Sequence, residues 1–237
     1  MNKISQLKHL DLEGCEINER SRNDLLFSCQ HLESLCLYAV NIPTHTIKSI
    51  CLQNGKTLQK LDRGSHNYNL TSSYGTRFSY TWHNTQFKES RKLKLESIQD
   101  IVYNCVELTE LNLDCISLCD DSLYCLANNL SPKILKLNLM STPIRDEHVK
   151  ALVIRCNKIT ELDLSKCYKI TNMALTNIIE NLKSSLQKLA LFSCWAITGA
   201  GGRNLTSLYQ LKSMPKLRYL GKNGSENDLK SLPKTTS

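Results

Sequence analysis

The chain has 237 residues, of which 41% are hydrophobic, and a formal net charge of +8. A chain of this length and apolar content can bury a large core, which excludes a disordered protein. It contains neither an apolar run of about 18 residues nor the apolar N-terminal segment of a signal peptide, which excludes a membrane protein and a secreted one. Its basic residues are scattered, which favours a solvated surface over a nucleic-acid-binding one. We therefore expect a soluble intracellular protein of the nucleus and cytoplasm that binds neither nucleic acid nor membrane.

One phrase with the spacing LxxLxL recurs along the sequence. Its best-formed copy is ITELDLSKCYKIT at 159–171, where Leu162 and Leu164 alternate with polar residues and Cys167 follows. Such alternation predicts a short strand with one buried face. A period of about 26 residues is typical of leucine-rich repeats. Copies of the phrase begin at Leu7, Leu32, Leu58, Leu108, Ile134, Ile159, Leu186 and, in part, Leu217.

A helix is expected before each following strand, because apolar residues recur there at helical spacing. The clearest helical patterns are Leu25, Leu26 and Cys29, then Ile98, Ile101, Val102 and Cys105, and then Val149, Leu152, Val153 and Cys156.

The pattern is lost between the third and fourth copies. Leu58 and Leu108 are 50 residues apart, about twice the period. We interpret residues 64–90 as one divergent unit with an enlarged polar loop. Its strand would carry the alternating aromatic residues Phe78, Tyr80 and Trp82.

The units must stack, because ordering one of them costs more free energy than burying its own apolar residues returns. We predict a single leucine-rich-repeat domain over residues 1–237 with about nine units. Its fold class is α/β, a solenoid or horseshoe with a concave parallel sheet and outer helices. Residues 221–237 are expected to cap the C-terminal end, whereas Leu7 already belongs to the core at the other end.

No pattern in the sequence predicts catalysis. The six histidines lie away from any nucleophile-like serine or cysteine, and no phosphate-binding glycine loop occurs. Cys115, Cys119 and Cys125 have the wrong spacing for zinc, so we expect no metal and no cofactor. Most of the eleven cysteines sit at repeat positions, where a buried thiol packs as a small apolar residue and can donate to a turn carbonyl. We expect a binding protein and not an enzyme.

Residues between the leucines are expected to face the concave surface in three rows. The rows mix charges with a few large apolar groups, a composition typical of a protein-binding surface. From the third row we select Tyr38, Asp114, Met140 and Phe192 as protein-binding residues, and we add Trp195 as an aromatic anchor at a turn. The alternative is that the large apolar members are single exposed residues without a role. The rows are His9, Ser34, Lys60, Glu110, Lys136, Glu161 and Lys188; Asp11, Cys36, Asp62, Asn112, Asn138, Asp163 and Ala190; and Glu13, Tyr38, Gly64, Asp114, Met140, Ser165 and Phe192.

Three phrases carry a resemblance to a known family. SCQHLESLCL at 28–37, NCVELTELNL at 104–113 and RCNKITELDLSKCYKIT at 155–171 resemble the cysteine-containing leucine-rich repeats of F-box proteins. The resemblance covers nearly the whole chain outside residues 64–90. Members of that family are substrate receptors of cullin-based ubiquitin ligases, in which an F-box before the repeats docks the adaptor. No room for an F-box precedes Leu7, which indicates either a fragment or shortened form of such a receptor or an F-box-free relative.

The resemblance implies a substrate-recognition module of an SCF-type ubiquitin ligase that binds a protein target non-covalently on its concave face. The adaptor and the cullin would be further partners if an F-box is supplied upstream. The alternative is an F-box-free scaffold or assembly factor with no ubiquitin role. A third class is a regulator that inserts Arg145 or Arg203 into the active site of a partner enzyme.

Overall fold

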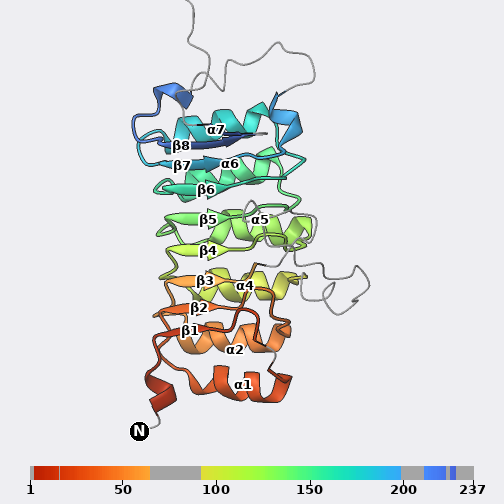
Figure 1. Cartoon of the computed structure of the whole chain (residues 1–237), viewed down its shortest axis with the longest axis vertical. Coiled ribbons are helices and arrows are strands. Elements are labelled where there is room, and N and C mark those ends of the chain that lie inside the picture. The colour runs from red at the N-terminus through yellow and green to blue at the C-terminus, as the bar shows by residue number, and fades with distance from the viewer. Residues whose placement is uncertain (1–2, 16, 65–91, 199–210, 223–224, 228–237) are drawn as a thin grey trace, which may run out of the picture.

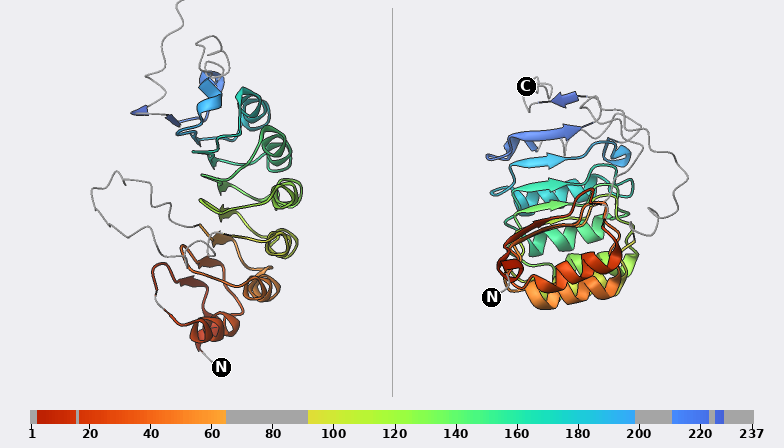
Figure 2. Two further views of the ribbon diagram at one scale, coloured as in Figure 1. Left: turned by 90° about the vertical axis from the view of Figure 1, so that its right-hand side faces the viewer. Right: turned by 60° about the horizontal axis from the view of Figure 1, so that its bottom comes forward.

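A computed structural model describes residues 3–15, 17–64, 92–198, 211–222 and 225–227. These residues form one sheet of nine strands in chain order, parallel from β1 to β8, with β9 antiparallel to β8. Strands line one side of the stack and helices the other (Figure 1), and the strands lie on the inner side of a curve (Figure 2). The predicted class, an α/β leucine-rich-repeat solenoid, is confirmed.

The strands are β1 (His9–Asp11), β2 (Ser34–Cys36), β3 (Lys60–Asp62), β4 (Glu110–Asn112), β5 (Lys136–Asn138), β6 (Glu161–Asp163), β7 (Lys188–Ala190), β8 (Tyr219–Lys222) and β9 (Ser225–Asn227). The α-helices are α1 (Glu19–Ser28), α2 (Thr44–Asn54), α4 (Leu95–Asn104), α5 (Asp120–Asn129), α6 (Asp146–Arg155) and α7 (Asn172–Leu182). Short 3-10 turns are η1 (Lys3–Gln6), η2 (Trp195–Thr198) and η3 (Leu211–Ser213). None of the helices in these ranges is long and apolar enough to cross a membrane.

Each strand from β2 to β7 buries its central leucine under the helices, and these leucines pair in register along the sheet. Burying one such side chain contributes about 1.5 to 3 kcal/mol, so the ladder of leucines is a main source of stability. At the first unit Leu7 is 37% exposed and Leu10 is half-buried. The core therefore begins at Leu12, and the expectation that Leu7 belongs to it is wrong.

A turn of constant geometry follows most strands. The Asn112 side-chain oxygen accepts the backbone N–H of Asp114 at 3.0 Å, and Asp11, Asp62, Asn138 and Asp163 accept the N–H two residues on in the same way. Three residues after the end of the strand, the backbone has a positive φ of 56° to 67°, including in the turns after β2 and β7, where the strand does not end in Asp or Asn; the residues are Gly14, Ala39, Cys115, Ser141, Lys166 and Ser193. Side-chain-bearing residues rarely adopt this left-handed conformation. The backbone N–H groups of Ala39, Cys115, Ser141 and Lys166 donate to carbonyls of the next unit, which holds these four turns in place.

The post-strand cysteines donate hydrogen bonds to the unit before them. Cys167 Sγ donates to the Leu139 carbonyl at 3.2 Å, and Cys194 Sγ donates to the Leu164 carbonyl at 3.0 Å. Thr142, at the equivalent position of its unit, donates to the same Leu139 carbonyl at 2.7 Å. The prediction that these thiols satisfy turn carbonyls is confirmed.

The prediction of a divergent repeat at 64–90 is wrong in one respect. Strand β3 pairs directly with β4, with Lys60 opposite Glu110, so no strand from the intervening residues stands between them. The described chain therefore has eight parallel strands, one fewer than the predicted nine units. Arg63 directly follows β3, takes the place of a core leucine there and is 1% exposed. Phe78, Tyr80 and Trp82 lie outside the described residues.

At the C-terminal end, β9 pairs antiparallel with β8 and ends the parallel series. Strand β9 and the last two residues of β8 belong to the predicted capping tail at 221–237. The tail residues 223–224 and 228–237 lie outside the described residues.

Candidate protein-binding groove

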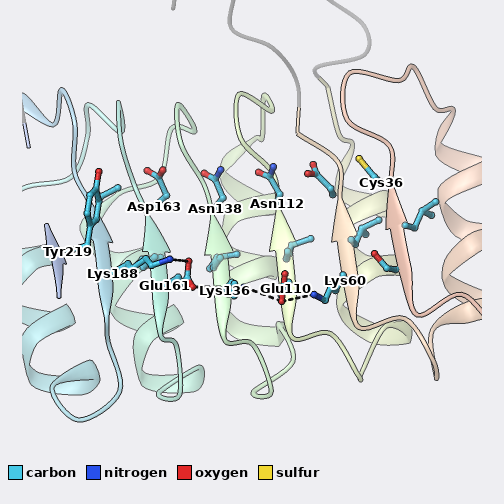
Figure 3. Close-up of a pocket in the computed structure, with 18 of the residues that line it drawn as sticks. Cys36, Lys60, Glu110, Asn112, Lys136, Asn138, Glu161, Asp163, Lys188 and Tyr219 are labelled. Carbon is cyan, nitrogen blue, oxygen red and sulfur yellow. Dashed lines mark hydrogen bonds and ion pairs between the residues drawn. The ribbon is translucent and has the colours of Figure 1, made fainter. Parts of the chain in front are cut away.

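A groove of about 550 Å³ follows the concave face across seven strands, from β2 to β8. Its floor is built from the residues that flank the central leucines, because alternation along each strand turns them away from the core. Figure 3 shows two of the predicted rows side by side, one acidic and amide-rich and one of alternating charge. The pairing of the strands confirms both rows as predicted, with Tyr219 and Gly221 of β8 as further members.

The alternating row is a continuous chain of ion pairs. Glu110 lies 3.0 Å from Lys60 and 3.4 Å from Lys136, and Glu161 lies 3.9 Å from Lys136 and 3.2 Å from Lys188. Burial raises the pKa of Glu110, but hydrogen bonding to Lys60 and the charges of Lys136 and Lys60 outweigh that effect, so its pKa lies below the usual value. The Glu110 carboxylate is therefore ionised at neutral pH and neutralises charge on the lysines beside it.

The amide-rich row has a structural role, since its members form the turns described above. Burial raises the pKa of Asp163 above its usual value, although hydrogen bonds from the Ser165 side chain and backbone oppose that shift. Asn112 and Asn138 form the same turn without a charge. This row thus shapes one side of the groove floor, and the ion-pair row on the other side supplies most of its charge.

Two of the predicted binding residues meet at the edge of the groove. The Tyr38 hydroxyl donates a hydrogen bond to Oδ2 of Asp114 at 3.2 Å. Burial, followed by the nearby Asp114 charge, raises the pKa of Tyr38 well above its usual value. Gly64 lies between them: a Cβ there would collide with the Asp114 carboxylate and approach the Tyr38 ring to 2.7 Å. Asp114 is only 4% exposed.

The prediction that the whole third row faces the concavity is therefore wrong for Asp114 and for Ser165, which is 1% exposed. The row follows the strands and lies in the turns, where alternation no longer sets the direction of side chains. Ser165 instead accepts a hydrogen bond from the Phe192 backbone N–H at 3.1 Å.

The other three predicted residues lie apart from this pair. Met140 is half-buried in its turn, and its carbonyl accepts the Cys115 N–H at 2.7 Å. Phe192 lines the C-terminal end of the groove, with its ring against Gly221. Trp195 is 64% exposed at the start of η2 and is not part of the groove lining.

The charged row was predicted from the sequence but was not selected as the binding site. The pattern that could have indicated it is the alternation of lysine and glutamate at one repeat position, from Lys60 to Lys188. Tyr219 was missed as well, although extending the row by one unit to the residue before Leu220 would have found it.

Among the described residues, one group of side chains that could ligate a metal lies close together: Asp11, Glu13 and Cys36. Burial raises the pKa of Cys36 to about 11, so its thiol stays protonated at neutral pH and is a poor ligand. Asp11 already accepts the Glu13 N–H at 2.9 Å in its turn. The three cysteines considered for zinc, Cys115, Cys119 and Cys125, do not form such a group in the described ranges.

No protein-family model and no curated protein matches the chain. Similar solved structures include the leucine-rich repeat-containing protein LegL7 from Legionella pneumophila, at 16% identity and a TM-score of 0.48, over 92% of this chain and 67% of that one. A chain of the yeast Rad7 and Elc1 complex matches at 14% identity and a TM-score of 0.38, over 84% of this chain.

The tropomodulin C-terminal domain of Caenorhabditis elegans matches at 14% identity and a TM-score of 0.39, over 52% of this chain and 77% of that one. The present chain spans 59% of the length of the chain from the Rad7 and Elc1 complex. Similarities at this level assign neither a family nor a function.

Proposed function

We propose that the chain is a substrate-recognition module of an SCF-type ubiquitin ligase and binds a protein target non-covalently in the concave groove. The observation that carries the binding role is the groove itself, with its charged floor and an aromatic end at Phe192 and Tyr219. Large aromatic residues are enriched in protein-binding surfaces, where they anchor the partner. The ubiquitin-ligase context rests on the resemblance of the cysteine-containing repeats.

The charges of the groove favour a protein over a nucleic acid. Three lysines line it, Lys60, Lys136 and Lys188, and they lie beside four carboxylates. A phosphate backbone would meet a floor without excess positive charge, although the protein as a whole carries +8. The carboxylates are Asp62, Glu110, Glu161 and Asp163.

A cell-cycle regulator is the target class that the sequence suggests. The phrases LKHLDLEGCEI at 7–17, SCWAIT at 193–198 and MPKLRYL at 214–220 look like those of the S-phase kinase-associated receptor, which selects cell-cycle inhibitors for ubiquitination. In that role the protein acts in the nucleus and cytoplasm, with an adaptor and a cullin as further partners.

The proposal is tested by affinity capture of the protein as cells produce it, followed by mass spectrometry. We expect an adaptor, a cullin and a protein target to be recovered together. Lys136→Glu should lose the target and keep the adaptor, because Lys136 lies in the groove. Lys150→Glu, the same charge change on the outer helix α6, should keep both.

Recovery of a target without adaptor or cullin would contradict the ubiquitin-ligase context and support the alternative, an F-box-free scaffold or assembly factor. Equal loss of target from both variants would contradict the groove as the binding site.

A further inference from the structure

The turns that follow β6 and β7 carry the most exposed aromatic side chains of the described chain. Tyr168 is 61% exposed and Trp195 is 64% exposed, and Met173 at the start of α7 is 62% exposed. Aromatic residues and methionine are enriched in protein interfaces. Exposing their apolar surface to water is unfavourable in free energy, and a partner that covers it removes this cost. We call these three residues, with Lys166 and Lys169, the edge patch.

The two aromatic residues occupy the same position in adjacent units. Tyr168 directly follows Cys167, and Trp195 directly follows Cys194. The two turns run side by side, since Cys194 Sγ donates to the Leu164 carbonyl and the Lys166 N–H donates to the Phe192 carbonyl at 2.6 Å. The equivalent residues of three earlier units are Asn41, Ser117 and Pro143. The repeat framework therefore does not require an aromatic residue at this position.

The positive charges beside the aromatic pair have no negative counterpart among the described residues. Lys166 and Lys169 flank Tyr168, and neither forms an ion pair within the described ranges, unlike the groove lysines. Asp146 is already engaged, because its carboxylate accepts hydrogen bonds from the Thr171 N–H at 2.8 Å and the Thr171 hydroxyl at 2.6 Å.

Glu147, the other acidic residue at the start of α6, lies 3.7 Å from Arg145. In the part of the chain that the structure describes, the two lysines of the edge patch therefore have no acidic side chain paired with them.

We propose that the edge patch binds an acidic segment of a partner protein, which seats one apolar side chain against Tyr168 and Trp195 while its carboxylates face Lys166 and Lys169. This site lies outside the groove and so goes beyond the proposed function. It borders the groove, since Phe192 lines the groove end three residues before Trp195. The aromatic anchor supplies affinity, and the lysines select the charge of the partner.

The test uses the full chain with its tryptophan indoles labelled with ¹⁵N. The chain has two tryptophans, and a Trp82→Phe variant assigns the Trp195 signal. Three 12-residue probe peptides are titrated: one of glutamate and leucine, one of glutamine and leucine, and one of lysine and leucine. We expect only the glutamate peptide to shift the Trp195 signal, with an affinity that falls as salt is added.

The double variant Lys166→Glu with Lys169→Glu should weaken the glutamate peptide at least about fivefold, because both attractive charges become repulsive. A double variant with the same charge change on other surfaces, Lys150→Glu with Lys183→Glu, should bind as the unchanged chain does. An unmoved Trp195 signal, or equal shifts with all three peptides, would overturn the proposal. Loss of groove binding in the capture experiment would leave this result unaffected, so the two proposals fail separately.

Discussion

The Tyr38 hydroxyl donates a hydrogen bond of 3.2 Å to the Asp114 carboxylate across 76 residues of sequence. The bond ties the second unit to the fourth and passes over Gly64 of the third, whose missing side chain leaves room for it. Both residues were predicted to bind a partner. In the structure, their hydrogen bond connects the units on either side of residues 65–91.

Tyr38→Phe should lower the free energy of unfolding by about 1.5 to 3 kcal/mol, the range for a hydrogen bond to a charged group. The measurement is urea unfolding at pH 7.4. Tyr168→Phe, which removes the same hydroxyl from an exposed ring, is the control and should change stability by less than about 0.5 kcal/mol. Equal effects of the two variants would show that the hydrogen bond contributes nothing.

The left-handed backbone conformation of the turns predicts that replacing Ala39 by glycine stabilises the protein. Ala39 has a φ of 58°, a conformation that costs a side-chain-bearing residue roughly 1 to 2 kcal/mol. Part of the gain in Ala39→Gly is offset by the greater freedom of glycine in the unfolded chain, so we expect a net gain of about 0.5 to 1 kcal/mol. Ala127→Gly, in the regular helix α5, should instead destabilise by about 1 kcal/mol. A loss of stability in both variants would contradict the strained turn.

The burial of His148 predicts that the stability of the protein falls as the pH decreases. Its side chain is fully buried against Tyr124, and its Nδ1 accepts the Arg145 backbone N–H at 3.2 Å. Burial lowers its pKa below 6.5, the nearby Glu147 and Asp120 charges oppose that shift, and Arg145 and Lys169 add to it. The unfolded chain therefore takes up the proton first, so this contribution to stability is fully present above pH 6.5 and is lost as the pH falls below it.

His148→Gln keeps an acceptor for the Arg145 N–H and removes the titrating group. Urea midpoints measured between pH 7.5 and 5.5 should decline less steeply for this variant than for the unchanged chain. Parallel declines would show that His148 does not carry the effect.

The cysteines should differ sharply in reactivity. All eleven thiols are free, and Cys15 and Cys119 are the exposed ones. Burial raises the pKa of Cys156 and Cys194 to about 11 and that of Cys167 to about 12, so little thiolate forms at neutral pH. Iodoacetamide at pH 7.4 should label the two exposed thiols first, as followed by mass spectrometry of peptides. In urea all eleven thiols should react. Labelling of Cys167 in the folded protein at the same rate as Cys15 would contradict the burial of the Cys167 thiol.

The sequence predicted those features that each repeat determines locally. The spacing around Leu162 and Leu164 defines a strand, and the equivalent spacing in other units sets the register of Lys60, Glu110 and Lys136 along the sheet. The donor role of Cys167 followed in the same way, because every unit presents the same turn to the next.

Features that depend on contacts between distant units could not be predicted. Asp114 is buried because Gly64 has no side chain and Tyr38 covers the space, a relationship among three units. The direct pairing of β3 with β4 was hidden by the loss of the repeat pattern after Arg63. Trp195 was predicted as an anchor, and its neighbour Tyr168 was missed because the repeat phrase gave it no position on the concave face.

The concave groove is the surface that we propose binds a protein target. The most direct test of this binding is photo-crosslinking from p-benzoylphenylalanine placed at position 136 on the groove floor or at position 154 on the outer helix α6, where Ile154 is 53% exposed. In cell extract we predict one dominant protein adduct from position 136, which Glu161→Lys abolishes, and no such adduct from position 154. The same adducts from both positions, or none from position 136, would contradict the account.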